Sequence, residues 1–159
     1  MGRRQRGFSL IELLIVVAII LIITAIAVPS YLRAKMAANE ASAVNSVHAI
    51  STSEIGYSST FPDIGFSAAL SDLGYGGTMP CAGGPNAGCF LDDSLASGDK
   101  AGYHFTYVQD TSYTPSLAFT LNADPHVRSL TGQLSYYLDQ NNVIRFNSSA
   151  TASVTDPAL

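Results

Sequence analysis

The chain has 159 residues, a length that suits one domain with appended segments. Its formal net charge is −4, but three of its eight basic residues, Arg3, Arg4 and Arg6, stand within the first six positions. Without residues 1–7 the remainder would hold five basic and twelve acidic groups, a formal charge of −7, so we do not expect this body to bind nucleic acid through its phosphates.

Residues 1–7 are a short basic leader ending in Gly7, and residues 8–28 are an apolar run of 21 residues. As a helix this run would be about 31 Å long, enough to cross a bilayer core. A cleaved secretory signal peptide is the alternative, since Ala25-Ile26-Ala27 fits its cleavage pattern, but the run is too long and contains Glu12. We therefore expect a retained transmembrane helix, with the leader in the cytoplasm and the body outside it.

Residues 29–56 are expected to continue this helix as an amphipathic segment, because good helix formers dominate residues 32–43. Pro29 lacks the amide that would bond the carbonyl of Ala25, so the membrane helix either ends there or is kinked. Gly56 is the expected helix stop. The apolar stripe expected to face a sheet consists of Ala37, Ala41, Val44, Val47, Ile50 and Ile55.

Residues 57–99 are expected to form a connecting loop region, with short helices near 67–73 and 91–97, because residues 74–89 hold six glycines and two prolines. Cys81 and Cys89 are the only cysteines, and an even count outside the cytoplasm favours a disulfide between them. A metal site would need further ligands nearby, and none of the three histidines is close to them in sequence; these are His48, His104 and His126.

Residues 100–159 are expected to hold an antiparallel sheet and a C-terminal tail, which makes the fold class α+β. Aromatic, β-branched and alternating apolar residues predict about four strands laid on the helix, at 103–108, 116–121, 134–138 and 143–146. The tail after Asn147 is expected to be poorly ordered, and Asn147-Ser148-Ser149 fits a glycosylation sequon. Calcium ligands at the 139–142 turn, Asp139, Asn141 and Asn142, are the alternative to an ordinary hairpin turn, which we favour.

The segment Gly7-Phe8-Ser9-Leu10-Ile11-Glu12-Leu13 resembles the class III signal of type IV pilins and type II secretion pseudopilins. The resemblance extends to about residue 57, and beyond it only the layout of helix, loop and strands matches. It implies that a prepilin peptidase cuts between Gly7 and Phe8, that the new amine of Phe8 is methylated, and that Glu12 forms an assembly salt bridge with the Phe8 amine of a neighbouring subunit. It also implies a kink or local melting at Pro29 within one helix.

The position of Glu12 can also be argued without the resemblance. As the fifth residue of the apolar run it lies about 7 Å from the cytoplasmic end, so its carboxylate could reach the lipid headgroups. It could also complement the N-terminus of its own helix. In a filament there is no headgroup region, and a buried carboxylate needs a cation, which at that level is an N-terminal amine.

The sequence thus predicts a structural subunit of a type IV pilus, most like a major pilin, with a pseudopilin or minor pilin of a type II secretion system as the alternative. A single-span enzyme or sensor is disfavoured, because the sequence contains no recognisable catalytic or phosphate-binding pattern. We expect no enzymatic activity, cofactor or metal. The expected partners are further copies of the chain, the prepilin peptidase and the inner-membrane assembly machinery. The precursor would lie in the inner membrane and the filament at the cell surface.

Overall fold

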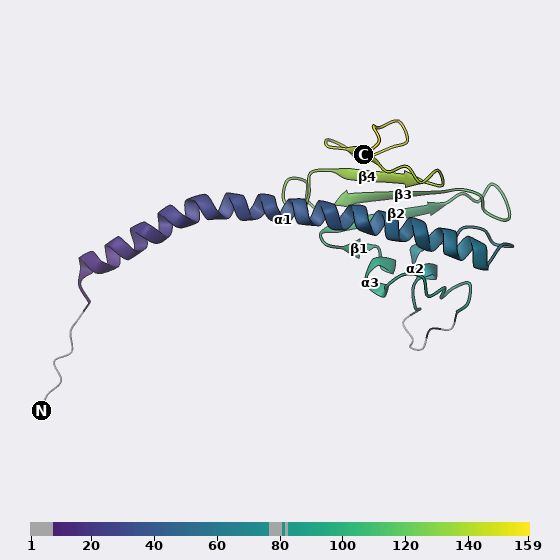
Figure 1. Cartoon of the computed structure of the whole chain (residues 1–159), viewed down its shortest axis with the longest axis horizontal. Helices are drawn as coiled ribbons and strands as arrows, with labels where there is room; N and C mark the ends of the chain where they lie inside the picture. Colours follow the sequence, from purple (N-terminus) through teal and green to yellow (C-terminus); the bar gives the residue numbers. More distant parts are fainter. Residues whose placement is uncertain (1–7, 77–80, 82) are drawn as a thin grey trace, which may run out of the picture. The chain divides into compact units, whose positions relative to one another are not determined.

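The computed structural model describes residues 8–76, 81 and 83–159, so the expected leader with Gly7 lies outside the described residues. The chain divides into two compact units, one up to Lys35 and one from Met36 to Leu159, which are described separately here. Helix α1, Leu10–Thr60, contributes to both (Figure 1). In the first unit α1 is the only regular element among the described residues.

In the first unit, α1 does not end at Pro29, which lies inside the helix. The hydroxyl of Thr24 donates to the carbonyls of Ile20 and Leu21, at 2.9 and 3.1 Å. Pro29 has no amide to donate to the carbonyl of Ala25. The Thr24 hydroxyl does not replace that bond, because it bonds carbonyls one turn earlier in the helix. Whether the backbone opens at Pro29 in an assembled state stays a prediction.

In the second unit, α1 turns one face toward the core. The predicted stripe is confirmed for Val47 and Ile50, which are fully buried, but Ala37, Ala41 and Ile55 are exposed. The true face follows the three- and four-residue spacing of a helix and includes polar side chains, which an apolar pattern cannot reveal. Its buried members are Ala43, Ser46, Val47, Ile50, Ser51, Ser53, Glu54 and Tyr57.

The prediction that Gly56 ends the helix is wrong, because α1 continues to Thr60. A Cβ atom on Gly56 would lie 3.2 Å from ring carbons of Phe90, so the glycine permits a close approach of this aromatic side chain. The helix stops just before Phe61-Pro62, where the proline ring disfavours helical backbone at the preceding residue.

The sheet has five strands in the order β1-β2-β3-β4-β5, each antiparallel to its neighbours. This confirms the predicted meander, with one strand more than the four expected. The additional strand, β1, is only two residues long and offers no periodicity to detect. The bounds are β1 Asp99–Lys100, β2 Tyr103–Gln109, β3 Phe119–Pro125, β4 Ser135–Asp139 and β5 Arg145–Asn147.

Strand β3 begins and ends later than the strand predicted at 116–121. Ser116 makes its backbone contacts with the segment after α1. It forms an isolated bridge with Gly65, and its amide donates to the carbonyl of Ile64 at 2.8 Å. Its hydroxyl also donates to the carbonyl of Asp110 at 2.8 Å. The segment therefore ties the β2–β3 connection to the chain that follows α1, and pairing with β2 starts only at Phe119.

One face of the sheet packs against α1 within the second unit, and two one-turn helices, α2 (Leu70–Leu73) and α3 (Asp93–Ala96), complete the core (Figure 1). Both lie within the two segments where short helices were expected. The buried apolar side chains of the sheet alternate along its strands, as expected for a half-covered antiparallel sheet. They are Tyr103, Phe105, Phe119, Leu121, Ala123, Tyr136 and Leu138.

The prediction of a poorly ordered tail is wrong. Ala152 is only 3% exposed, and its carbonyl accepts a 2.7 Å hydrogen bond from the side-chain amide of Asn122. Farther along, the amide of Phe146 donates to the carbonyl of Pro157, and the amide of Leu159 donates to that of Ile144. The tail thus folds back along β5 and covers hydrogen-bonding groups of this edge strand, which the composition of the tail does not reveal.

Candidate functional site: the N-terminal helix and the anchored body

The first unit presents an apolar helix without a covering partner in its own chain. Every described side chain from Phe8 to Lys35 is exposed. By length and composition α1 can cross a membrane, a test that an N-terminal signal sequence would also pass. An apolar surface of this extent must be covered by lipid or by other protein chains.

Glu12 lies at the start of α1 and caps it. Ser9 is the residue before the helix, and its amide donates to Oε2 of Glu12 at 3.0 Å. This is the contact that a glutamate at the third helical position makes in a capping box. The expectation that Glu12 could serve its own helix N-terminus therefore has a geometric basis. A carboxylate accepts several hydrogen bonds, so this contact leaves capacity for a cation.

Phe8, the residue at the expected cleavage and methylation position, is 80% exposed and precedes the helix. Gly7, on the other side of the expected cleavage junction, lies outside the described residues. The cleavage, the methylation and the pairing of Phe8 with Glu12 therefore remain proposals.

In the second unit, polar side chains of α1 attach the helix to the loop between β3 and β4. The side-chain amide of Asn39 donates to the carbonyl of Thr131 at 2.7 Å. One oxygen of Glu40 accepts from the amides of Gln133 and Leu134, at 2.7 and 3.3 Å. Because a charged acceptor strengthens a hydrogen bond, Glu40 is a firm attachment point between helix and body.

Glu54 is a second attachment point, and the sequence analysis missed it. It is fully buried, and its carboxylate accepts hydrogen bonds from the amide and the hydroxyl of Ser67. The hydroxyl of Tyr107 donates to the carbonyl of Ser67 at 2.9 Å. Burial raises the pKa of the Glu54 carboxyl, and the hydrogen bonds from Ser67 partly oppose this. Its helical spacing from Val47, Ile50 and Tyr57 is the signal that could have identified it.

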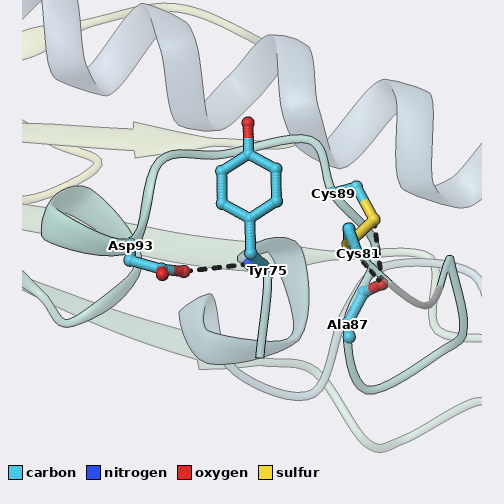
Figure 2. The surroundings of a disulfide bond; sticks show 5 residues. All are labelled: Tyr75, Cys81, Ala87, Cys89 and Asp93. Atoms are coloured by element: carbon cyan, nitrogen blue, oxygen red, sulfur yellow. Dashed lines mark hydrogen bonds between the residues drawn. A yellow bond between two sulfur atoms is a disulfide. The ribbon is translucent and has the colours of Figure 1, made fainter. Parts of the chain in front are cut away.

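Cys81 and Cys89 are bridged, with their Cα atoms 6.1 Å apart, which confirms the predicted disulfide. Both sulfur atoms lie 3.4–3.5 Å from the carbonyl oxygen of Ala87 (Figure 2). The phenol of Tyr57 donates to the carbonyl of Pro85 at 2.8 Å, so the bridged loop is attached to α1. The amide of Tyr75 donates to Asp93, which connects the residues before the loop with α3.

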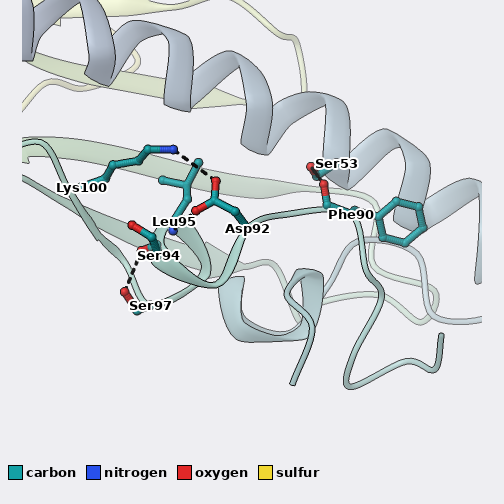
Figure 3. A network of polar contacts seen from close by, with 7 residues as sticks. All are labelled: Ser53, Phe90, Asp92, Ser94, Leu95, Ser97 and Lys100. Carbon is teal, nitrogen blue, oxygen red and sulfur yellow. Dashed lines mark hydrogen bonds and ion pairs between the residues drawn. The ribbon is translucent and has the colours of Figure 1, made fainter. Parts of the chain in front are cut away.

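The segment after the disulfide is also held to α1. Ser53 donates to the carbonyl of Phe90 at 3.0 Å (Figure 3). Asp92 caps α3 by accepting from the amide of Leu95 at 3.0 Å, and its other oxygen lies 3.1 Å from Nζ of Lys100. The cap bond is the largest cause of the lowered pKa of Asp92. Together these contacts hold the segment from Phe90 to Lys100 in place beside α1.

The turn after β4 is consistent with an ordinary hairpin turn. Asp139 accepts from the amide and the side chain of Asn141, at 2.9 and 3.1 Å, and Asn142 adopts a positive φ of 59°. Ser51 of α1 donates to the side chain of Asn142 at 2.8 Å. No three side chains of the described ranges are arranged as a ready metal site. The side-chain oxygens of Asp139 thus hold the turn together, and that of Asn142 attaches it to α1.

The side chain of the sequon residue, Asn147, takes part in packing the tail. Its oxygen accepts from the amides of Ser149 and Ala150, and its nitrogen donates to Asp156 at 3.0 Å. The nitrogen that would carry a glycan is therefore engaged in an internal contact.

An exposed apolar N-terminal helix combined with an antiparallel five-stranded sheet is a type IV pilin-like α+β architecture. The family model of the prokaryotic N-terminal methylation motif matches residues 2–28. The type IV major pilin protein PilA of Myxococcus xanthus (strain DK1622) is 41% identical over 56 residues, which are 35% of this chain and 26% of that protein. The matched part thus spans about a quarter of the relative, and no solved structure matches. Over these stretches the chain is similar to type IV pilins.

Proposed function

We propose that this chain is a structural, non-enzymatic subunit of a type IV pilus filament. The observation that carries the proposal is the exposed apolar segment of α1, which holds Glu12 in its first turn. A membrane covers this segment in the precursor, and the corresponding segments of other subunits cover it in the filament. The methylation motif and the similarity to a major pilin support the same role.

In the proposed mechanism, a prepilin peptidase cuts between Gly7 and Phe8 and the new amine is methylated. Glu12 of one subunit then pairs with the Phe8 amine of the next. In the apolar filament core an unpaired carboxylate would be strongly unfavourable, so the incoming subunit must bring a positive charge. Cleavage creates that charge at Phe8, and assembly therefore follows processing.

The test is a Glu12→Val variant, scored separately for membrane level, leader cleavage and yield of sheared filaments. Insertion should persist or improve, because a carboxylate within a span costs roughly 3 kcal/mol near its centre. Cleavage should persist, since Gly7 and Phe8 are unchanged, while filament yield should fall at least about tenfold, which corresponds to 1.4 kcal/mol per added subunit.

Thr24→Val is the matched control, because it also introduces valine into the exposed part of α1 but removes no charge. Its filament yield should equal that of the wild type. Normal yield from Glu12→Val would refute the pairing, and equal loss in both variants would point to general damage of the helix surface.

The alternative is a pseudopilin or minor pilin of a type II secretion system, which would use the same leader and the same Glu12. Electron microscopy of sheared surface filaments, combined with mass analysis, separates the two roles. A shaft subunit is the main protein of long filaments, whereas a minor subunit is a trace component of filaments built from another chain.

A further inference from the structure

Three side chains with no part in the proposed filament role meet on the face of the sheet that points away from α1. Nδ1 of His104 lies 3.1 Å from Oδ1 of Asp99, and Nε2 of His126 lies 3.0 Å from the same oxygen. The side chains are 53%, 52% and 48% exposed for His104, Asp99 and His126. An ion in solution can therefore reach all three.

The topology of the sheet brings this group together, because His126 is more than twenty residues from Asp99 and His104 in the sequence. Asp99 on β1 is the Cα partner of His104 on β2. His126 directly follows β3, and its amide donates to the carbonyl of Gly102 at 3.0 Å, in the turn between β1 and β2. Backbone pairing thus sets the positions of all three residues.

Asp124 provides an independent observation beside this group. It is the Cα partner of His104 across β2 and β3, so the two side chains emerge on the same face. Its Oδ1 is buried and has no hydrogen-bond partner within the described part of the chain. A buried carboxylate oxygen without a partner is unfavourable, and a nearby cation or an imidazole N–H would relieve the cost.

We propose that Asp99, His104 and His126 bind a transition-metal ion such as Zn²⁺. Two imidazoles and one carboxylate are a typical zinc ligand set, whereas calcium and magnesium prefer oxygen ligands alone. Ligand atoms about 2.0–2.1 Å from a tetrahedral ion lie about 3.3 Å from one another. Both nitrogen–oxygen distances in the group are close to this separation. A water molecule would complete the coordination.

One adjustment is required, since the side chains do not yet form a ready metal site. The ring centroids of His104 and His126 are 6.2 Å apart, whereas two imidazoles on one tetrahedral ion would have centroids about 5 Å apart. Rotation of half-exposed side chains closes this difference without moving the paired backbone. Asp124 would then accept from the second ring nitrogen of His104, an arrangement that orients metal-binding imidazoles.

The charge around the group also favours a cation. Lys100, the neighbour of Asp99 on β1, is paired with Asp92 at 3.1 Å. The bound ion would connect β1 and β2 to the segment after β3, so it should stabilise the folded body in proportion to its occupancy.

The test is a calorimetric titration of Zn²⁺ into the full chain in detergent micelles, without a polyhistidine tag. About one ion should bind per chain, and the thermal unfolding temperature should rise with Zn²⁺. The double variant His104→Gln, His126→Gln should lose both effects while keeping the metal-free unfolding temperature of the wild type. His48→Gln is the matched control, because His48 is exposed on α1 outside the group, and it should bind as the wild type does.

Two measurements test the arrangement. Asp124→Asn should keep the stoichiometry and weaken binding by about tenfold, the size expected for a carboxylate that orients a ligand. Co²⁺ should give the strong visible absorption of a tetrahedral site, and excess Ca²⁺ should not displace it. Absence of Zn²⁺ binding to the wild type, or equal binding to the double variant, would overturn the proposal.

Discussion

Two glutamates of α1, Glu12 and Glu54, lie in opposite surroundings. Glu12 is exposed and caps the start of the helix, where a partner from another subunit can approach it. Glu54 is fully buried and faces two donors of Ser67 rather than a cation. The first is thus suited to an intermolecular role, and the second to attaching the connecting region to the helix.

Stability should depend on pH through Glu54. Burial raises the pKa of its carboxyl above the ordinary value of 4.5, so the folded chain holds this proton more tightly than the unfolded chain. The resulting stability is fully present below pH 4.5 and is lost as pH rises through the folded-state pKa. A difference of one unit between the pKa values of the folded and unfolded chain corresponds to about 1.4 kcal/mol of unfolding free energy.

Glu54→Gln should remove this dependence, because an amide cannot ionise and can still bond with Ser67. Urea unfolding of the full chain in detergent, followed between pH 4 and pH 8 for both proteins, measures the difference in unfolding free energy. The surroundings include Asp72, Tyr57 and Tyr107, which both proteins share. Parallel pH profiles of the wild type and the variant would contradict the prediction.

At the scale of elements, α1 is one helix in the structure, yet its two parts have different surroundings. In the first unit, Pro29 leaves the carbonyl of Ala25 without an amide partner. The hydroxyl of Thr24 does not fill this gap, because it donates to the carbonyls of Ile20 and Leu21. In an apolar filament core such a carbonyl would be costly. Local opening of the backbone near Pro29 would let these groups find other partners.

We therefore predict a break in regular hydrogen bonding at Pro29 within an otherwise continuous helix in the filament. Cryo-electron microscopy of wild-type filaments should show it, and Pro29→Ala, which restores the amide, should give regular helix there. A wild-type map with unbroken α-helix from Ile22 to Arg33, or with a sharp turn into a separate helix, would contradict this.

The disulfide belongs to the same scale, because it closes a short loop in the connecting region. Replacing both Cys81 and Cys89 by serine should lower the free energy of unfolding by about 2.6 kcal/mol, from the chain entropy of a loop of this length. The sheet should persist, because its strands pair independently of the loop. Denaturant unfolding measures the loss, with the non-reduced wild type as reference, and equal midpoints would count against the prediction.

For the whole molecule, the proposed processing changes the charge as well as the length. Loss of residues 1–7 removes Arg3, Arg4 and Arg6, so the formal charge moves from −4 to −7. The basic leader suits retention on the cytoplasmic side of a membrane. The remaining acidic chain suits assembly through apolar and specific polar contacts rather than through binding to nucleic acid.

We predict that the mature chain begins with N-methylated Phe8. Intact-mass analysis of purified filaments should show the loss of residues 1–7 and the gain of one methyl group, since the methylation motif spans this junction. An uncleaved precursor from cells without prepilin peptidase is the control. Filaments that retain Met1 to Gly7 would refute the prediction.

The sequence by itself determined those features that depend on one segment of chain. The apolar run at 8–28 is long enough to span a bilayer in any context, and the Gly7-Phe8 junction with Glu12 is a contiguous pattern. Most strands of the meander were predictable because alternation along a strand records which side is covered. The disulfide was predictable because only two cysteines exist.

Tertiary structure decided the features that depend on contacts between distant segments of the chain. Gly56 lies inside the helix, where it permits the close approach of the Phe90 ring, and Glu54 is buried where Ser67 supplies its donors. The start of β3 is delayed because Ser116 pairs with Gly65. Likewise, His104 and His126 converge on one carboxylate only through strand register. Such contacts join residues separated by many positions, and local periodicity carries no information about them.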